Sequence, residues 1–321
     1  MKLSIVVPCY EEEKVIEQFY KVITETLEQE KFEYNLVLVN DGSKDNTLSI
    51  LKALAQKDER VKYITFSRNF GKESAMLAGL SFSDGDVIII MDADLQHPPS
   101  LIPKLVEGYH EGYDQVIAQR TRTGDSFGRT VLSRLYYKMI NKLVDVKLVN
   151  GQGDFRLLSR RAVNALLDLN EYNRFSKGLF SWIGFKEKVI KYENVLRDAG
   201  ESKWTFSKLL SYGIDGVISF NNKPLRISIY LGIITTVFAI LYVFVSLVQN
   251  LIYGIDVPGY FTTIASILVL GGIQLLFLGV IGEYIGRIYY EIKRRPHYII
   301  EEENVRKGEE VKEHVYTSRG Y

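Results

Sequence analysis

Val87-Ile88-Ile89-Ile90-Met91-Asp92-Ala93-Asp94-Leu95-Gln96 is the most informative part of this chain. A short apolar run rich in Ile and Val, followed at once by polar residues, is typical of a fully buried parallel strand. In open α/β sheets the ligand-binding groups lie just beyond the carboxyl ends of such strands. Two carboxylates around one small residue are hard oxygen ligands, which suit Mg²⁺ or Mn²⁺ bound together with substrate phosphates. An Asp-rich turn that caps a helix starting near Pro98 would explain the same residues.

The first 200 residues alternate short apolar runs with segments long enough for crossover helices. This rhythm predicts a mostly parallel sheet with helices on both faces, the Rossmann-like α/β class. The expected strands are Leu3–Val7, Leu36–Val39, Val61–Phe66, Val87–Met91 and Gln115–Ala118.

Composition narrows the class of protein. The 321 residues include 40 Lys and Arg against 39 Asp and Glu, so the overall charge gives no sign of nucleic-acid binding. A single cysteine, Cys9, excludes an intrachain disulfide and fits a reducing compartment. Met1-Lys2 leads directly into a strand-like run without a signal-peptide core, so we expect the first domain to stay in the cytosol.

Two long apolar runs follow residue 220. Ile227–Val248 has 22 residues and Tyr260–Gly282 has 23, and neither contains a charged residue. At about 1.5 Å per residue each helix would span roughly 33 Å, enough for a hydrocarbon core of about 30 Å. The sequence therefore predicts two transmembrane helices, although a single such run could be a buried helix of a soluble protein.

The charges beside these runs predict their orientation. Lys223 and Arg226 precede the first run and four basic residues follow the second, whereas the connecting segment 249–259 carries only Asp256. By the positive-inside rule both termini and the first domain face the cytoplasm, which predicts a multi-pass protein of the cell inner (plasma) membrane. Glycines in the second run suggest close helix packing, within the chain or between protomers of a homo-oligomer.

The expected organisation has four parts. A cytosolic α/β domain covers residues 1–200, an amphipathic juxtamembrane segment 201–225, two transmembrane helices with a short external loop 226–286, and a cytosolic tail 287–321. The second part could be an interfacial helix in the headgroup plane or an ordinary amphipathic helix packed on the domain. The tail is charged and polar from Glu301, so we expect it to be poorly ordered.

Polar motifs follow the first two strands. The first strand ends in Pro8-Cys9-Tyr10-Glu11-Glu12, and no Gly-x-Gly-x-x-Gly follows it, which disfavours a dinucleotide-binding Rossmann site. Asn40-Asp41-Gly42-Ser43 places a carboxylate where it could accept hydrogen bonds from a base or ribose, beside a glycine that allows a tight turn. Asp45 or Asn46 could serve only as a helix N-cap.

A basic motif follows the third strand. Arg68-Asn69-Phe70-Gly71-Lys72 could offer a cation and backbone N–H groups to an anionic ligand. A solvated basic turn would have the same composition.

Taken together, these motifs resemble family 2 glycosyltransferases, in their order and in their spacing. The downstream half is similar to the polyprenyl-phosphate branch of that family, which includes bactoprenol glucosyltransferases and dolichol-phosphate mannose synthases. The resemblance implies a GT-A nucleotide-sugar domain. It rests on Pro8-Cys9-Tyr10-Glu11-Glu12, Asp41-Gly42-Ser43-x-Asp45-x-Thr47, Arg68-Asn69-x-Gly71 and Asp92-Ala93-Asp94-x-Gln96.

The resemblance implies a role for each matching residue. Asp92, Asp94 and Gln96 would hold Mg²⁺ or Mn²⁺ and the donor diphosphate. The residues expected around the nucleotide sugar are Pro8, Tyr10, Glu12, Asp41, Asp92, Ala93 and Arg120. Arg129, Ser133, Arg197 and Lys203 correspond to the site of the acceptor phosphate. Asp154 matches the family's candidate base, and Asp94, Arg129, Ser133 and Arg197 complete the expected catalytic set.

Physical chemistry supports these roles. A donor diphosphate and a lipid phosphate bring several negative charges into one pocket, and a divalent cation and arginines would compensate them. A phosphate monoester has a second pKa of about 6, so it is mostly a competent nucleophile at neutral pH. Asp154 could therefore remove a residual proton, orient an arginine, or simply satisfy the sheet edge.

The resemblance implies an inverting hexosyltransferase that uses a nucleotide sugar, UDP-glucose above all, and polyprenyl (undecaprenyl) phosphate. UDP-N-acetylglucosamine or GDP-mannose would fit the same enzyme class. A processive polysaccharide synthase shares the donor fold, but its Gln-x-x-Arg-Trp element and additional membrane helices are not found in this sequence. A catalytically silent membrane scaffold is disfavoured by the intact Asp92, Asp94 and Arg129.

Overall fold

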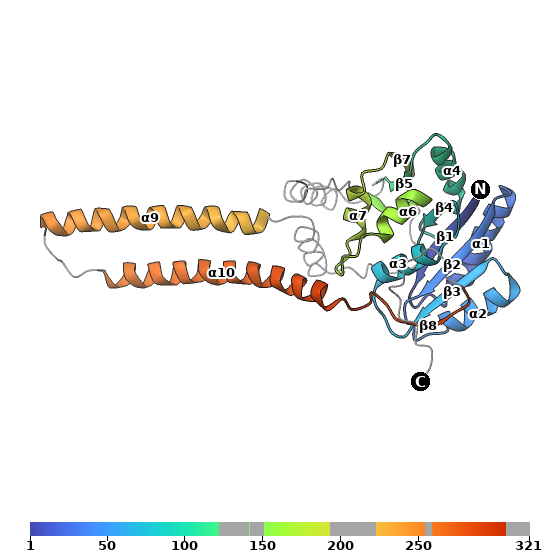
Figure 1. Ribbon diagram of the computed structural model, residues 1–321, viewed down its shortest axis with the longest axis horizontal. Coiled ribbons are helices and arrows are strands. Elements are labelled where there is room, and N and C mark those ends of the chain that lie inside the picture. The colour runs from blue at the N-terminus through green and yellow to red at the C-terminus, as the bar shows by residue number, and fades with distance from the viewer. Residues whose placement is uncertain (122–140, 142–150, 193–222, 254–258, 306–321) are drawn as a thin grey trace.

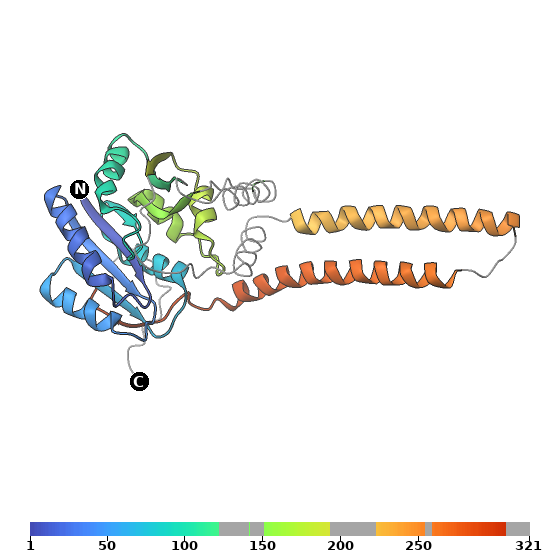
Figure 2. The same ribbon diagram turned by 180° about the vertical axis from the view of Figure 1, so that it is seen from behind.

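The computed structural model describes residues 1–121, 141, 151–192, 223–253 and 259–305. An α/β domain holds a single twisted sheet, and a long helical hairpin extends away from it (Figures 1 and 2). The strands are β1 (Lys2–Cys9), β2 (Glu33–Asn40), β3 (Val61–Phe66), β4 (Val87–Ile90), β5 (Gln115–Arg120), β6 (Gln152–Ser159), β7 (Glu187–Tyr192) and β8 (Ile300–Glu303). The helices are α1 (Ile16–Gln29), α2 (Thr47–Lys57), α3 (Lys72–Phe82), the 3₁₀ turn η1 (Pro99–Leu101), α4 (Ile102–His110), α6 (Arg160–Leu167), α7 (Ser176–Trp182), α9 (Lys223–Tyr253) and α10 (Tyr260–Lys293).

The sheet has the order β7-β5-β6-β4-β1-β2-β3-β8. The pairs β1–β2, β1–β4, β2–β3 and β5–β7 are parallel, which confirms the predicted mostly parallel α/β class. All five predicted strands form. Their interiors are buried because helices cover both faces of the sheet, and this explains their continuous apolar runs.

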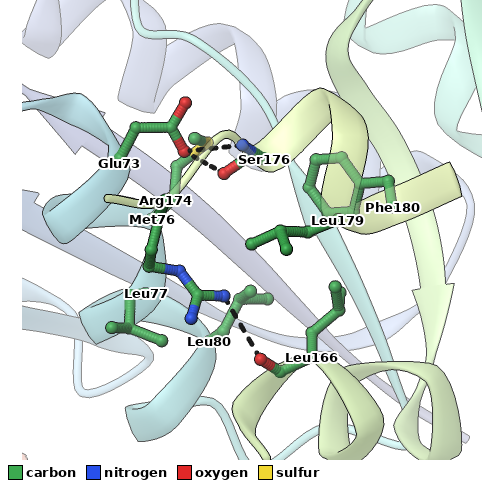
Figure 3. Close-up of a pocket in the computed structure, with 9 residues that line it drawn as sticks. All are labelled: Glu73, Met76, Leu77, Leu80, Leu166, Arg174, Ser176, Leu179 and Phe180. Carbon is green, nitrogen blue, oxygen red and sulfur yellow. Dashed lines mark hydrogen bonds between the residues drawn. The ribbon is translucent and has the colours of Figure 1, made fainter. Parts of the chain in front are cut away.

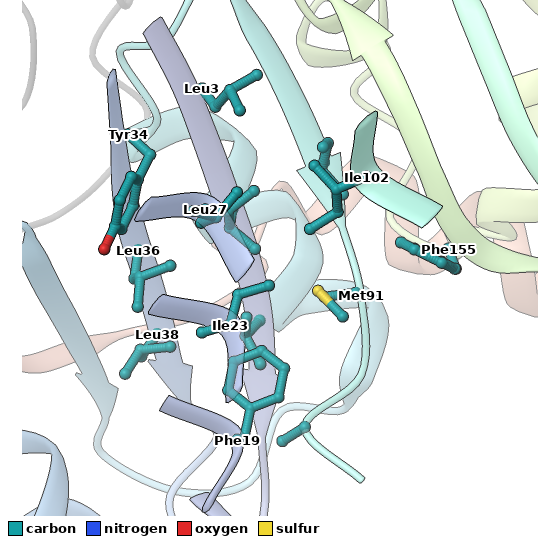
Figure 4. Close-up of a cluster of buried hydrophobic side chains, with 14 of the residues drawn as sticks. Leu3, Phe19, Ile23, Leu27, Tyr34, Leu36, Leu38, Met91, Ile102 and Phe155 are labelled. Atoms are coloured by element: carbon teal, nitrogen blue, oxygen red, sulfur yellow. The ribbon is translucent and has the colours of Figure 1, made fainter. Parts of the chain in front are cut away.

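Each face of the sheet has its own hydrophobic core. On one face α1, α2 and α4 pack against the strands, as Figure 4 shows for Phe19, Ile23 and Leu27 beside Leu36 and Leu38. The spacing of Ile16, Phe19, Ile23 and Leu27 places one apolar stripe of α1 on the sheet. On the other face α3, α6 and α7 form a second core.

Three strands were not predicted. β6 runs antiparallel between β4 and β5, and β7 extends the sheet beyond β5. β8 pairs antiparallel with β3 at the opposite edge. The prediction of a poorly ordered segment from Glu301 was therefore wrong for residues 301–303, which belong to a strand.

The return of the chain to the sheet is anchored by specific contacts. Tyr298 is 6% exposed and its ring stacks on Phe66, with centroids 4.9 Å apart and an interplanar angle of 11°. The Glu302 carboxylate accepts a hydrogen bond from the Tyr63 hydroxyl and pairs with Lys52. These contacts tie the segment after α10 to the strand that leads into the basic motif at 68–72.

The helices α9 and α10 lie side by side and antiparallel (Figures 1 and 2). Among the described residues, Val269–Lys293 in α10 is the one helical segment long and apolar enough to cross a membrane. Tyr230–Tyr242 in α9 is a shorter apolar segment. Large apolar side chains remain exposed on both helices, including Phe238, Leu251 and Leu275.

The glycines of α10 have no close neighbour among the described residues. A Cβ atom added at Gly271, Gly272, Gly279, Gly282 or Gly286 would meet no described atom within 4 Å. The predicted amphipathic segment falls almost entirely in residues 193–222, outside the described residues.

We predict that Tyr298→Ala destabilises the α/β domain by about 3 kcal/mol or more, because it removes a buried ring from the contact with Phe66. Thermal unfolding of the purified chain in detergent measures the effect. The neighbouring Ile299 is 40% exposed, so Ile299→Ala is the matched control and should shift the transition far less. Equal shifts for both variants would contradict the anchoring role.

Candidate active site

The polar residues of the motifs meet at the carboxyl edge of the parallel strands. Asp92 follows the end of β4, and Lys72 is the first residue of α3. The register of β4 and β6 pairs Ile90 with Arg156. Since these two strands are antiparallel, Asp154 reaches the same end of the sheet as Asp92.

Lys72 joins the two carboxylates. Its Nζ lies 2.6 Å from Asp92 Oδ1 and 2.7 Å from Asp154 Oδ2. Burial opposes the charged form of Asp92, but His97 and Lys72 outweigh it and hold the pKa of Asp92 well below its usual range. The pKa of Asp154 is also lowered: burial opposes this shift and the charge of Lys72 favours it. Both carboxylates are therefore ionised at neutral pH. Sequence reasoning treated Lys72 only as part of a basic loop.

His97 stands on the other side of Asp92. Its Nε2 is 3.7 Å from Asp92 Oδ2, and its Nδ1 is 2.7 Å from the Tyr192 hydroxyl. When that hydroxyl donates to Nδ1, the imidazole carries its proton on Nε2, directed at the carboxylate. His97 thus lies between Asp92 and Tyr192 and helps to hold the Asp92 carboxylate in place.

A buried arginine lies two residues beyond Asp154 on β6. Arg156 is 2% exposed, donates to the Gly153 carbonyl at 2.8 Å and stacks over the Phe180 ring at 3.8 Å. Burial lowers the pKa of Arg156 to about 10, which the charge of Asp154 partly opposes. The positive charge of Arg156 therefore contributes to the electrostatic field around Asp154. Arg156 was not identified from the sequence.

Asp94 and Gln96 lie on the more open side of the motif. Asp94 is exposed, its Oδ1 accepts the backbone N–H of Gln96 at 3.1 Å, and it forms no ion pair with any described residue. Leu95 between them has φ 55°, the left-handed conformation that turns the chain. Ala93 is buried behind the motif with 1% exposure.

These donors fit a hard divalent cation. No three His, Cys, Asp or Glu side chains of the described ranges form a closed ligand set. Oxygen atoms of Asp92, Asp94 and Gln96 match instead the open type of site, in which one or two carboxylates share the ion with substrate phosphates. With Lys72 included, Asp92, Asp94 and Asp154 carry a net charge of about −2, which a divalent ion would balance.

Asp41 links two loops. Its Oδ1 accepts the backbone N–H of Phe70 at 2.6 Å and its Oδ2 that of Gly71 at 2.9 Å. The side chain is almost fully buried, and burial raises its pKa although the two N–H donors oppose the shift. The predicted base-binding carboxylate thus holds the basic motif in place, a contact that sequence reasoning missed.

The second motif also supports the first loop. Ser43 Oγ and Thr47 Oγ1 accept the backbone N–H groups of Glu11 and Glu12, both at 3.0 Å, and Asp45 Oδ2 accepts that of Glu13 at 3.2 Å. Asp45 also accepts the N–H of Thr47 at 3.1 Å, whereas Asn46 makes no capping hydrogen bond. The spacing Ser43-x-Asp45-x-Thr47 therefore positions the loop that carries Tyr10 and Glu12. Pro8 and Glu12 are half-buried there, and Tyr10 is 41% exposed.

The remaining predicted residues fall into two groups. Arg120 is described at the end of β5, where its N–H donates to the Gly151 carbonyl at 3.1 Å. Arg129, Ser133, Arg197 and Lys203 lie outside the described residues.

A cavity connects the basic motif with the base of the helical hairpin. It has a volume of about 410 Å³ and is lined by Arg68, Gly71, Tyr172, Arg174 and His297, among others. The Tyr172 backbone N–H donates to Glu291 of α10 at 2.7 Å, and the Tyr172 ring stacks on Tyr290 at 5.5 Å. The hairpin therefore contacts the domain next to the loop that precedes Lys72.

Beside this cavity, Glu73 turns into the interior of the domain. Figure 3 shows its carboxylate facing Ser176 at the start of α7, which donates both its hydroxyl and its backbone N–H. Burial raises the pKa of Glu73 to about 7 despite these hydrogen bonds. Lys72 and Glu73, adjacent in sequence, thus point to different environments, one in the candidate site and one in the packing of α3 against α7.

We predict that Gly42→Ala disturbs the candidate site. Gly42 has φ 63°, and a Cβ atom there would lie 2.3 Å from the Arg68 carbonyl carbon and 2.6 Å from the Asn69 nitrogen, so the basic motif must shift. We expect a roughly tenfold loss of nucleotide affinity by calorimetry, which is about the net contribution of one hydrogen bond from the displaced motif.

Gly112 provides the matched control. It has φ 90° but a Cβ atom there would meet nothing within 4 Å, so Gly112→Ala carries the backbone strain without the collision. An equal loss of nucleotide affinity in both variants would show that the contact with residues 68–69 is unimportant.

Comparisons with known proteins show the family of this chain. Residues 4–167 match the model of glycosyl transferase family 2, and residues 223–288 match that of the GtrB C-terminal hairpin. CsbB of Bacillus subtilis (strain 168), a protein named as a glycosyltransferase, is 56% identical over 303 residues, which cover 94% of this chain and 92% of the relative. The SfII prophage-derived bactoprenol glucosyl transferase of Shigella flexneri is 44% identical over 301 residues, which cover 94% of this chain and 97% of the relative.

Among solved structures, the chain is similar to glucosyl-3-phosphoglycerate synthase from Mycobacterium tuberculosis. The TM-score is 0.46 at 20% identity, over 68% of this chain and 77% of the other. The family follows from the relatives, because the matches to them cover nearly the whole length of both chains. The chain is a glycosyltransferase and belongs to glycosyl transferase family 2, with a GT-A-like α/β domain and a GtrB-type C-terminal hairpin.

Proposed function

We propose that this enzyme transfers a hexose from a nucleotide sugar to polyprenyl (undecaprenyl) phosphate, with UDP-glucose as the donor. The observation that carries the proposal is the position of the Asp92–Lys72–Asp154 cluster relative to the hairpin. The loop before Lys72 lines one cavity together with His297, which follows α10. Relatives named bactoprenol glucosyl transferase, 43–44% identical over 94% of this chain, support a lipid phosphate as acceptor.

In this proposal the reaction is a single displacement. An oxygen of the lipid phosphate attacks the anomeric carbon, the bond from that carbon to the donor diphosphate breaks, and the nucleoside diphosphate leaves with the electron pair. The configuration at the anomeric carbon is inverted. Because a phosphate monoester is mostly a dianion at neutral pH, the attacking oxygen needs little help from a base.

The residues have the following proposed roles. Asp92, Asp94 and Gln96 would hold Mg²⁺ or Mn²⁺, which supplies charge compensation for the departing diphosphate when bound. Arg129, Ser133, Arg197 and Lys203 would hold the acceptor phosphate. The nucleotide sugar would be surrounded by Pro8, Tyr10, Glu12, Asp41, Ala93 and Arg120. Asp154 orients Lys72 rather than accepting a proton, because its carboxylate already makes the 2.7 Å ion pair.

We further propose that α9 and α10 both cross the inner membrane, with the α/β domain and both termini in the cytoplasm. The two helices have 31 and 34 residues, which correspond to roughly 45–50 Å. Their exposed apolar side chains, such as Phe238 and Leu275, would be in contact with lipid. The small glycines of α10 would allow close packing between protomers of a homo-oligomer.

The test incubates the purified full chain in detergent with Mn²⁺, undecaprenyl phosphate and a panel of labelled nucleotide sugars. We expect organic-phase label from UDP-glucose. Asp94→Asn should lower kcat/KM about 100-fold, because the divalent ion that compensates the charge of the departing diphosphate would be held less tightly. Asp168→Asn, at an exposed carboxylate, is the matched control and should keep wild-type activity.

Other outcomes would contradict the proposal. Label confined to a water-soluble polymer would favour a processive synthase. No lipid-linked label from any donor would contradict transfer to a polyprenyl phosphate. Label from UDP-N-acetylglucosamine or GDP-mannose alone would replace glucose and leave the reaction class intact.

A further inference from the structure

One ammonium group serves two carboxylates in the candidate site. Lys72 Nζ is 2.6 Å from Asp92 Oδ1 and 2.7 Å from Asp154 Oδ2, so two of its three N–H donors are directed at acidic groups. Without this cation the two carboxylates, brought together by the β4–β6 register, would repel each other in a partly buried place.

The same geometry creates a competition for Asp92. Lys72 occupies Asp92 Oδ1, and Oδ2 faces His97 Nε2 at 3.7 Å. A divalent ion that takes an Asp92 oxygen would bring a positive charge beside the ammonium group of Lys72. Two cations at one carboxylate oxygen are unfavourable, so at least one contact of Asp92 must be given up.

The side chain of Lys72 can change position when a divalent ion binds to Asp92. Its side chain is 43% exposed, compared with 30% for Asp92 and 16% for Asp154, so its outer side is open to a ligand. The flexible four-carbon stem allows the ammonium group to change partners. Lys72 is also the first residue of the 11-residue helix α3, whose amino end favours anions such as phosphate.

We propose that Lys72 is an exchangeable counter-ion of the donor site. It holds Asp92 beside Asp154 while no donor is bound, and it passes to a diphosphate oxygen when Asp92 takes the divalent ion. Asp154 remains its second partner and determines where the ammonium group is presented. The inference rests on the proposed function, and it adds a positioning and phosphate-binding role for a residue outside the Asp92-Ala93-Asp94 motif.

The alternative is that Lys72 has a purely structural role and keeps both ion pairs when the donor binds. Binding measurements distinguish this role from that of an exchangeable counter-ion. The experiment uses the full-length protein in detergent and requires neither lipid nor turnover. Mn²⁺ binding without nucleotide is followed by electron paramagnetic resonance. Binding of UDP, with GDP in parallel, is followed by calorimetry in excess EDTA. The variants are Lys72→Met, Lys72→Gln and Lys72→Arg.

For an exchangeable counter-ion the two affinities move in opposite directions. Lys72→Met should bind Mn²⁺ about tenfold more tightly, because the ion no longer competes with an ammonium group for Asp92. The same variant should bind metal-free nucleotide about tenfold more weakly, because a positive charge near the phosphates is lost. Lys72→Gln keeps hydrogen-bond donors without the charge and should behave like Lys72→Met. Lys72→Arg keeps the charge and should stay near wild type in both assays.

The matched control is Lys188→Met, which removes a half-buried lysine paired with Glu111 at 2.5 Å and should change neither affinity. Unchanged or weaker Mn²⁺ binding in Lys72→Gln, or unchanged metal-free nucleotide binding, would overturn the proposal and leave a structural strut. If Lys72→Met does not fold, Lys72→Gln decides. Wild-type protein that binds Mn²⁺ and nucleotide but labels no lipid would refute the acceptor assignment and not the role of Lys72.

Discussion

The ion pairs of Lys72 with Asp92 and Asp154 hold the candidate active site together. They join α3, the segment after β4 and β6 into one polar cluster at the carboxyl edge of the sheet. The surrounding charges keep both acids ionised. This cluster has excess negative charge and lies next to the exposed carboxylate of Asp94. Such an arrangement suits a divalent ion bound together with a phosphorylated ligand, and it does not suit an apolar ligand.

The rest of the domain holds this cluster in place. Asp41 fixes the loop that leads to Lys72 through two backbone N–H groups, and Gly42 lets the loop approach to contact distance. The strand β8 attaches the segment after α10 to β3, whose end begins the same loop. The hairpin and the loop at residues 68–72 are therefore connected through one edge of the sheet.

Sequence reasoning recovered what local patterns encode. Short apolar runs predicted β1 to β5, because burial on both faces leaves a continuous signal, and the motifs at their ends predicted where polar groups would gather. β7 and β8 have polar or acidic exposed faces and form through pairing with distant segments, so no local pattern marks them. The partners of Lys72 and Asp41 depend on strand register and loop geometry, which motif spacing does not report. Arg129, Ser133, Arg197 and Lys203 stay predictions.

A cryo-electron microscopy structure of the full chain with Mn²⁺ and UDP would show directly whether Lys72 changes partner at the proposed donor-diphosphate site. We expect the ion at Asp92 and Asp94, with Lys72 Nζ on a phosphate oxygen, still paired with Asp154 and separated from Asp92. A nucleotide bound elsewhere, or bound here with the Lys72–Asp92 ion pair intact, would contradict the proposed role of Lys72.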